Sequence, residues 1–411
     1  MKTAHMAPAS HGITRREGLL SLLGTAMTLA GCGGGGGGVA GVSSGGTGSF
    51  SVGAISGFGS VIVNGVRFED MNALVSDDDG VPRSRSDLKL GMVVRVRGSS
   101  ISSGPSGRSG RADTIIFGSE LVGPISSVSP STRTLVVLGQ TVEIRGSTVF
   151  EDGLSSDLGA LDVLVRASTP VVIEVNGFVD PVANRIMATR IELRNSPNLY
   201  RIEGLVRNFN GAAGTFNIGS LAIRFDATTD VRVTLAADVL VRVRLVAVVP
   251  APAVFTAQRI RPPEEPVEDR DEAEVEGMIT AFTTPSAFFV NGLQIDARQA
   301  AFPDGTAGLA VGARVEVEGR VVNDVLVATK VELEKQIDNL EFELRGLIGN
   351  LDAVAKTFVL RGVTVDFSGT ATFLPVGRTA ANLANNVDVE VKGVAAVNGT
   401  GISATQIKFQ T

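Results

Sequence analysis

The same order of short strand-like segments occurs five times in this chain of 411 residues. In each copy an opening glycine precedes a two-residue turn, a segment of alternating apolar and polar residues, and a closing segment in which a β-branched residue follows an alanine by three positions. Apolar residues at every second position indicate β-strands rather than helices, because successive side chains of a strand point to opposite faces. The closing segments begin at Ala112, Ala188, Ala257, Ala328 and Ala404.

The turns of the copies carry residues that tolerate a positive φ. Asn-Gly pairs favour type I′ hairpins, and a glycine in the first turn position, as in the third copy, favours type II′. A second turn before the fourth strand holds glycine, aspartate or asparagine in four copies, whereas Pro170 stands there in the second copy and predicts a different turn. The turn residues singled out are Asn64, Gly65, Gly91, Gly219, Asn291, Gly292 and Gly312.

Each copy offers five or six strands within roughly seventy residues and no convincing helix. A sheet this short must close or pack on another to bury one face and protect its edges. We therefore expect an all-β chain, a tandem array of about five small OB-like β-barrels that touch end to end. The expected parts are a signal peptide (1–31), a Gly/Ser-rich tether (32–50), five barrels (51–120, 121–197, 198–262, 274–336 and 337–411) and an acidic, Pro-rich flexible linker (263–273).

The N-terminal segment has the features of an export signal with a lipidation site. Arg15 and Arg16 precede a short apolar stretch, and Leu29-Ala30-Gly31-Cys32 looks like a bacterial lipobox, whose cysteine receives diacylglycerol. A buried free thiol is the weaker reading of Cys32, since a glycine run follows it at once. We expect a protein anchored in the membrane through Cys32, held on a flexible tether.

The route of export and the side of the membrane stay open at this point. The residues around Arg15 and Arg16 resemble a twin-arginine signal, but Gly18 stands where a phenylalanine is usual, so general secretion is equally compatible. Gly33, directly after the cysteine, is not the aspartate that retains such lipoproteins in the inner membrane. In a cell with two membranes we expect the outer membrane, facing the periplasm or the surface.

Missing residue types exclude several functions. Removing residues 1–31 would take away both histidines, three basic residues and one acidic residue, and would change the net charge from −6 to −8. The remainder has no histidine or tryptophan and a single tyrosine, Tyr200. A Ser-His-Asp triad is then impossible, zinc and copper lose their favoured ligands, and the negative charge opposes nucleic-acid binding. We expect no cofactor and no enzymatic activity.

The sequence contains two acidic stretches, and the first is a weak candidate for calcium binding. Asp77-Asp78-Asp79 is the densest carboxylate cluster, and carboxylates are suitable ligands for Ca²⁺. The cluster lacks the alternate spacing of an EF-hand loop, so we interpret it as a solvated loop and keep calcium as the weaker alternative. The acidic run from 264 to 276 is interpreted as a solvated linker, because prolines and arginines interrupt it.

The segments Ile55–Ser60 and Val61–Phe68, with Leu88–Gly98 and Ala112–Ile115, resemble bacterial repeats of domain-of-unknown-function family 5666 (DUF5666). The resemblance covers most of the chain after Phe50, is strongest in the first and fourth copies, and is weak in the second and third. It implies an exported, often lipid-anchored β-protein and supplies no catalytic residues.

These observations favour a lipid-anchored protein of the cell envelope with a structural or adhesive role. Repeated modules on one anchor raise avidity without a strong single site. The partners we expect are envelope proteins or glycans. The alternative is an exported hydrolase that uses paired carboxylates on glycans.

Overall fold

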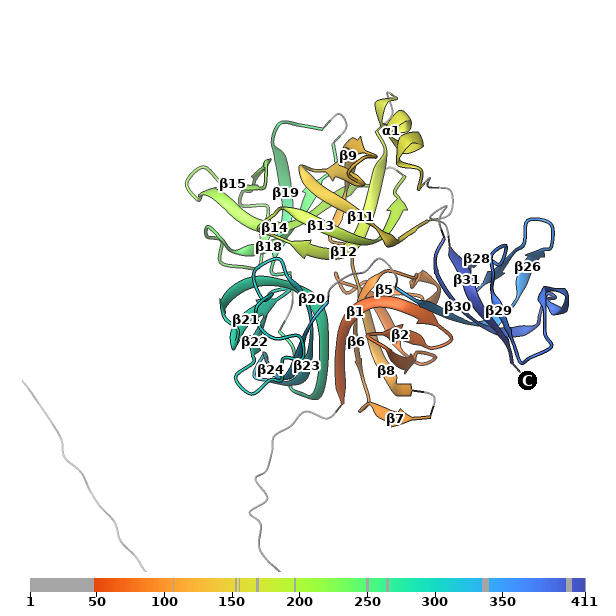
Figure 1. Ribbon diagram of the computed structural model, residues 1–411. Coiled ribbons are helices and arrows are strands. Elements are labelled where there is room, and N and C mark those ends of the chain that lie inside the picture. Colours follow the sequence, from red (N-terminus) through yellow and green to blue (C-terminus); the bar gives the residue numbers. More distant parts are fainter. Residues whose placement is uncertain are drawn as a thin grey trace, which may run out of the picture. The chain divides into compact units, whose positions relative to one another are not determined.

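The structure is a computed structural model, and it describes residues 48–411 except 106, 152–153, 155, 168–169, 196, 249–250, 264–265, 335–339, 397–400 and 411. The expected signal peptide and lipobox, including Cys32, lie outside the described residues. Nearly all described elements are strands, and the strands form five closed barrels (Figure 1).

Barrel 1 shows the topology that all five share. Its first strand pairs with the second and fourth, the second with the third, and the fifth with the third and fourth. The third and fifth strands run parallel, which closes the barrel in the strand order 1-2-3-5-4 of an OB-fold. These strands are β1 (Ser49–Phe58), β2 (Val61–Val63), β3 (Val66–Glu69), β6 (Val93–Gly98) and β8 (Gly107–Phe117).

The other copies repeat this order, which confirms the expected array of small OB-like barrels. Barrel 2 contains β9 (Leu121–Ser129), β10 (Thr134–Val137), β11 (Gln140–Phe150), β12 (Val172–Asp180) and β13 (Arg185–Leu193). Barrel 3 contains β14 (Leu199–Asn210), β15 (Thr215–Ile218), β16 (Leu221–Arg224), β18 (Leu240–Val246) and β19 (Phe255–Arg261). Barrel 4 contains β20 (Arg270–Thr284), β21 (Ala287–Val290), β22 (Leu293–Asp296), β23 (Arg314–Val322) and β24 (Val325–Leu333).

In barrel 5 the first strand is divided into β25 (Phe342–Leu347) and β26 (Gly349–Asp352). The remaining barrel strands are β27 (Thr357–Leu360), β28 (Val363–Asp366), β30 (Asp388–Ala395) and β31 (Ile402–Phe409). Short strands and turns fill the connections: β4 (Leu74–Asp77), β5 (Pro82–Arg83), β7 (Ser102–Gly104), β17 (Asp230–Val231), β29 (Thr372–Leu374), and the 3₁₀ turns Arg85–Asp87 and Ala380–Asn382.

The expected turn residues adopt positive φ. Asn64 and Gly65 have φ of 50° and 71°, and Asn291 and Gly292 have 50° and 89°. In the third copy Gly219 has φ of 54° and Ser220 does not have a positive φ, as in a type II′ turn. At the second turn Gly91 and Gly312 have φ of 80° and 83°.

The closing segment repeats because a bulge recurs where the last two strands pair. In barrel 1 the register shifts at Gly98, which faces Ala112. A Cβ on Gly98 would lie 2.0 Å from the Arg111 carbonyl oxygen, so a side chain cannot fit there. Three other barrels pair a glycine with the closing alanine in the same way, at Gly177, Gly319 and Gly393. Bulges twist a strand sharply, which a five-strand barrel needs in order to close.

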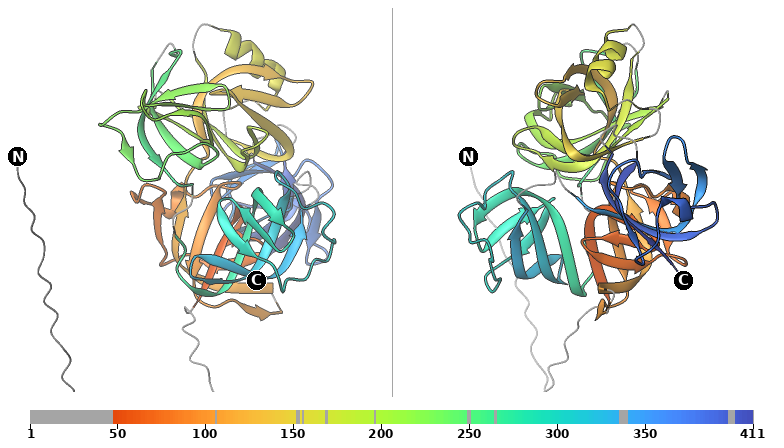
Figure 2. Two further views of the ribbon diagram at one scale, coloured as in Figure 1. Left: turned by 90° about the vertical axis from the view of Figure 1, so that its left-hand side faces the viewer. Right: turned by 45° about the vertical axis from the view of Figure 1, so that its right-hand side comes forward.

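The expectation of no helix is wrong for the second copy. Helix α1 (Leu158–Arg166) lies between the third and fourth strands of barrel 2 and covers one end of it (Figure 2). The Asp157 carboxylate caps the helix by accepting hydrogen bonds from the Gly159 and Ala160 N–H groups. A helix of nine residues has too short an apolar pattern to be recognised in the sequence. Packing of the buried Leu158 and Leu161 against the barrel stabilises it.

The expected flexible linker is also shorter than predicted. Strand β20 begins at Arg270, and before it Val267 is buried in the core of barrel 4. The Val267 N–H donates to an Asp324 carboxylate oxygen at 2.8 Å. Farther along the expected solvated run, Glu274 and Glu276 lie in β20 and are buried. Alternating apolar residues, Ala273 and Val275 among them, bring this stretch into the sheet.

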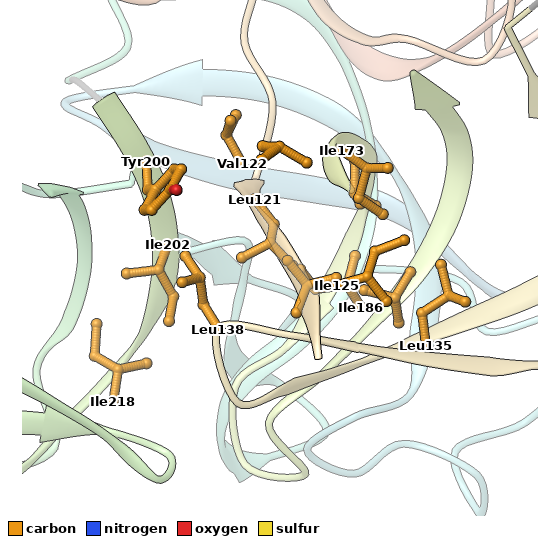
Figure 3. Packing of buried hydrophobic residues seen from close by; sticks show 14 of the residues in the cluster. Leu121, Val122, Ile125, Leu135, Leu138, Ile173, Ile186, Tyr200, Ile202 and Ile218 are labelled. Atoms are coloured by element: carbon orange, nitrogen blue, oxygen red, sulfur yellow. The ribbon is translucent and has the colours of Figure 1, made fainter. Parts of the chain in front are cut away.

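The barrels do not pair only with their neighbours in sequence. Strand β1 runs parallel to β20, from Ser49↔Glu272 to Val52↔Val275, and its last residues pair with β25. Barrel 1 therefore shares backbone hydrogen bonds with barrels 4 and 5, and its core is continuous with that of barrel 5. The cores of barrels 2 and 3 likewise merge, with Leu121 and Tyr200 in one cluster (Figure 3). We expected successive barrels to touch end to end, but barrel 1 instead pairs side by side with barrels 4 and 5, which lie far from it in the sequence.

Candidate functional site: a charged pocket beside a buried aspartate loop

The Asp77–Asp79 loop is buried against barrel 3, so its interpretation as a solvated loop is wrong. It follows β4, which runs parallel to β8 of barrel 1. The side chain of Asp78 has no exposed surface. It forms ion pairs with three arginines, Arg201 at 3.1 Å, Arg242 at 2.9 Å and Arg261 at 2.5 Å. Burial alone would raise the pKa of Asp78, but these three positive charges outweigh it and hold the pKa well below its usual range.

The two neighbouring aspartates also have cationic partners. Asp79 pairs with Arg244, with Arg259 at 3.0 Å and with Arg201 at 3.4 Å, while Asp77 pairs with Arg83 at 2.6 Å. Guanidinium groups thus occupy the carboxylate oxygens that a calcium ion would use. The three carboxylates do lie within 4.8 Å of one another, but their counter-ions belong to the chain.

Sequence reasoning identified the aspartates and missed their arginines. These arginines alternate with apolar residues on β18 and β19, as Arg242-Val-Arg244 and Arg259-Ile-Arg261. The arginines lie on the outward face of these strands, because Val243 and Ile260 between them point into the core. The sequence signal that could have predicted the cluster is a pair of arginines two residues apart. Two guanidinium groups on the same face of a strand need anions nearby.

On one side of the aspartate loop lies a pocket of about 530 Å³, which we call the charged pocket. That volume is within the range of small-molecule sites, ~300–1,000 Å³. Barrel 1 contributes the aspartates and nearby Arg83 and Lys89, barrel 2 contributes three glutamates, and barrel 3 contributes arginines and the tyrosine. The residues from barrels 2 and 3 that the argument uses are Glu151, Glu174, Glu192, Arg194, Tyr200, Arg201 and Arg244.

Barrel 2 lines the charged pocket with three glutamates and one arginine, whereas barrel 3 lines it with two arginines and no carboxylate. On the barrel 2 wall, Arg194 pairs with Glu174 and with Glu192, the latter at 3.2 Å. Burial would lower the pKa of Arg194, but Glu174, Glu192 and Glu151 raise it, so negative charge dominates this wall. On the barrel 3 wall, burial lowers the pKa of Arg244 and repulsion from Arg259 adds to the effect, although Asp78 and Asp77 oppose it.

Two groups of the pocket have unused bonding capacity. Glu151 accepts from the Leu193 N–H at 3.0 Å and has no ion-pair partner in the described part of the chain. Tyr200 is 1% exposed, and its ring packs edge-on against Phe255, with 6.2 Å between the ring centroids. Its hydroxyl has no hydrogen-bond partner among residues 48–411 as described, and burial raises its pKa. Because Tyr200 lines the charged pocket, its hydroxyl is available for a hydrogen bond to a polar ligand there.

A second acidic cluster lies where barrel 1 meets barrel 4. The carboxylates of Glu274, Glu316 and Glu318 approach within 4.8 Å of one another. Arg108 pairs with Glu274 at 2.9 Å, and Lys330 pairs with Glu318 at 2.8 Å. Burial, a hydrogen bond with Glu274 and neighbouring carboxylates raise the pKa of Glu316 to about 8. The raised pKa favours the protonated form of Glu316, which relieves the repulsion among the three groups.

Glu120 lies in a small cavity between barrels 1 and 3. The cavity is about 40 Å³ and is also lined by Glu203, Arg242 and Arg95. Glu120 accepts from the Gly177 N–H at 3.0 Å, whereas Arg242 lies 3.7 Å away and binds Glu203 at 2.6 Å. Burial raises the pKa of Glu120 to about 8, because Arg242 compensates only in part and Glu203 adds repulsion.

No described helix is long and apolar enough to cross a membrane.

A family model described as "Domain of unknown function (DUF5666)" matches residues 122–192, 276–332 and 345–408. These segments coincide with barrels 2, 4 and 5, so the expected tandem DUF5666 repeats are confirmed. The ranking of the copies was wrong in part: the second copy, expected to resemble the family weakly, is matched, and the first, expected to be among the strongest, is not. No curated protein matches the chain. Among solved structures, one titled "drosophila Unr CSD456" is 11% identical and covers 53% of this chain and 98% of its own, with a TM-score of 0.14.

Proposed function

Since this chain carries tandem DUF5666 repeats folded as OB-like barrels, we propose that it is an exported, lipid-anchored envelope protein that binds a hydrophilic envelope partner in its charged pocket. The single observation that carries the binding role is the pocket itself, which is lined by glutamates of barrel 2, by arginines of barrel 3 and by Tyr200, whose hydroxyl has no partner among the described residues.

The chemistry of the walls selects the class of partner. Carboxylates accept hydrogen bonds, guanidinium groups donate them, and a ligand with many hydroxyl and amide groups satisfies both. Envelope glycans have that composition, whereas an apolar ligand would displace water from the charged groups of the pocket without offering them hydrogen bonds. The proposal therefore commits to glycan as the occupant, with the lipobox cysteine Cys32 as the membrane anchor.

Two substitutions test the binding role without disturbing the fold. Tyr200→Phe removes a hydroxyl that has no partner in the described structure, so stability should be unchanged while glycan binding weakens. The loss of one hydrogen bond of ~0.5–1.5 kcal/mol corresponds to about two- to tenfold. Glu151→Gln should weaken binding similarly, because it removes a charged acceptor that makes no direct ion pair with a described residue.

The measurement is co-sedimentation of the full chain with purified insoluble envelope glycan. Asp113→Asn is the matched control, since Asp113 is half exposed on β8 and is not among the residues that line the pocket. If wild type does not sediment with the glycan, or if all three variants behave alike, the binding role is wrong. Release of reducing ends during the assay would instead support the hydrolase alternative.

The anchor is tested separately. Cys32→Ser removes the thiol that would receive diacylglycerol, so the variant should leave the detergent phase and appear in the aqueous phase after phase partition. A Cys32→Ser protein that remains with the detergent would refute the lipid anchor.

A further inference from the structure

A second polar pocket lies on the other side of the aspartate loop, and arginines dominate its walls. It has a volume of about 210 Å³, far above the ~10–15 Å³ that one water molecule needs. Besides Ser76, Ile116 and the loop residues 77–80, its lining residues are Arg95, Arg97, Arg232, Arg259 and Arg261. We call it the arginine pocket.

Several arginines of this pocket have carboxylate partners: Arg259 pairs with Asp79 at 3.0 Å, Arg261 pairs with Asp78 at 2.5 Å, and Asp230 pairs with both Arg232 and Arg259. These carboxylates do not neutralise the arginines fully, because the loop aspartates are shared with arginines outside the pocket. Asp78 also pairs with Arg201 and Arg242, and Asp79 also pairs with Arg201 and Arg244, none of which lines the arginine pocket. Crowded guanidinium groups repel one another. Burial lowers the pKa of Arg261 to about 10, and repulsion from Arg242, Arg201 and Arg95 contributes, while Asp78 opposes it.

Arg97 is the arginine with unused donors. It is half-buried on the outward face of β6, two residues from Arg95, with Val96 between them in the core. Its backbone pairs within the sheet, but neither a hydrogen bond nor an ion pair joins the Arg97 side chain to any described residue. Its guanidinium carries five N–H donors in a planar fork that matches the oxygens of phosphate.

We propose that the arginine pocket binds a phosphate-type oxyanion, with Arg97 as the principal donor and the other four arginines providing the positive potential. The role is independent of the glycan proposal, since Arg97 does not line the charged pocket. The oxyanion is either free inorganic phosphate or the phosphate of a lipid headgroup, which present the same oxygens.

Free phosphate is tested by thermal unfolding of the full chain in sodium phosphate and in sodium chloride of equal ionic strength. A ligand that binds only the folded state raises the midpoint as its concentration rises. We expect phosphate, but not chloride, to raise it, and Arg97→Ala to weaken the apparent affinity about tenfold. Arg320→Ala is the matched control, because Arg320 is an exposed arginine on β23 that also has no partner among the described residues.

Lipid phosphate is tested with the full-length Cys32→Ser chain, so that an acyl anchor does not contribute. Flotation with vesicles of phosphatidylglycerol, compared with phosphatidylcholine, would identify a lipid headgroup if binding is selective and Arg97→Ala abolishes it. Stabilisation by inorganic phosphate without vesicle binding would identify the free ion. Absence of both effects, or equal losses in Arg97→Ala and Arg320→Ala, would overturn the proposal.

Asp79→Asn keeps the test informative if Arg97→Ala fails to fold. This nearly isosteric change removes one negative charge from the wall, so phosphate should bind several-fold tighter. A protein that was merely damaged would bind more weakly, and unchanged or weaker phosphate binding in this variant would count against the proposal.

Discussion

Substitution of Glu120 by glutamine should remove a large part of the pH dependence of stability. In the folded protein the pKa of Glu120 is raised from its usual 4.5 to about 8 by burial, with Arg242 and the Gly177 N–H opposing the shift. The side chain is buried, 6% exposed, so solvent screens it little. Glutamine keeps the shape and the acceptor for Gly177 but cannot ionise.

The sign follows from the two pKa values. Below about pH 4.5 Glu120 is protonated in both states, and its contribution to stability is fully present. As the pH rises toward 8, the unfolded chain releases the proton while the folded protein retains it, so stability falls. The slope is ~1.4 kcal/mol per pH unit, and the loss above pH 8 is at most roughly 5 kcal/mol.

Urea unfolding at pH 5 and pH 8 measures this effect. Tyr200 is the single tyrosine and there is no tryptophan, so tyrosine fluorescence reports the region where β14 pairs with β9, next to Glu120. Wild type and Glu120→Gln should have similar urea midpoints at pH 5, and the variant should be more resistant at pH 8. Glu341→Gln, at a half-exposed site, is the control. Equal differences between wild type and Glu120→Gln at both pH values would refute a protonated Glu120.

Three further perturbations test other parts of the structure. Asp78→Asn leaves three buried arginines short of an anion and should lower the free energy of unfolding by roughly 3–5 kcal/mol; a loss below 1 kcal/mol in urea titrations would contradict the buried cluster. Gly219→Val should destabilise barrel 3 by more than the ~1–3 kcal/mol of backbone strain, because its Cβ would lie 2.3 Å from Asn184, whereas Gly305→Val, also at positive φ but in open space, should show the strain alone. Cleavage between 261 and 274 should leave the two fragments associated on size-exclusion chromatography, since β1 pairs with β20 and β25; separation into free pieces would show that these pairings are weak.

The sequence by itself determined what depends on neighbouring residues. Alternation set the inward and outward faces of each strand, so Val94 and Val96 are buried while Arg95 and Arg97 point away from the core. The turn residues required positive φ, and Gly65 and Gly292 have it. The repeated alanine marked the bulge that closes four of the barrels. These features are local, because φ preferences and side-chain period act over a few positions.

Only the tertiary structure decided which surfaces meet. The same three aspartates would be a solvated loop on an isolated barrel, but here Asp78 lies among arginines more than 120 positions away in the chain. The alternation on β18 and β19 places their arginines on the outward face, but it does not say which anions these arginines meet. The pairing of β1 with β20 follows no local pattern, since a strand edge bonds to any backbone of suitable register. Glu120 reads as an ordinary surface glutamate in sequence, and its raised pKa depends on desolvation by distant barrels. Charge compensation and desolvation are properties of the assembled fold, and for that reason the candidate sites became visible only there.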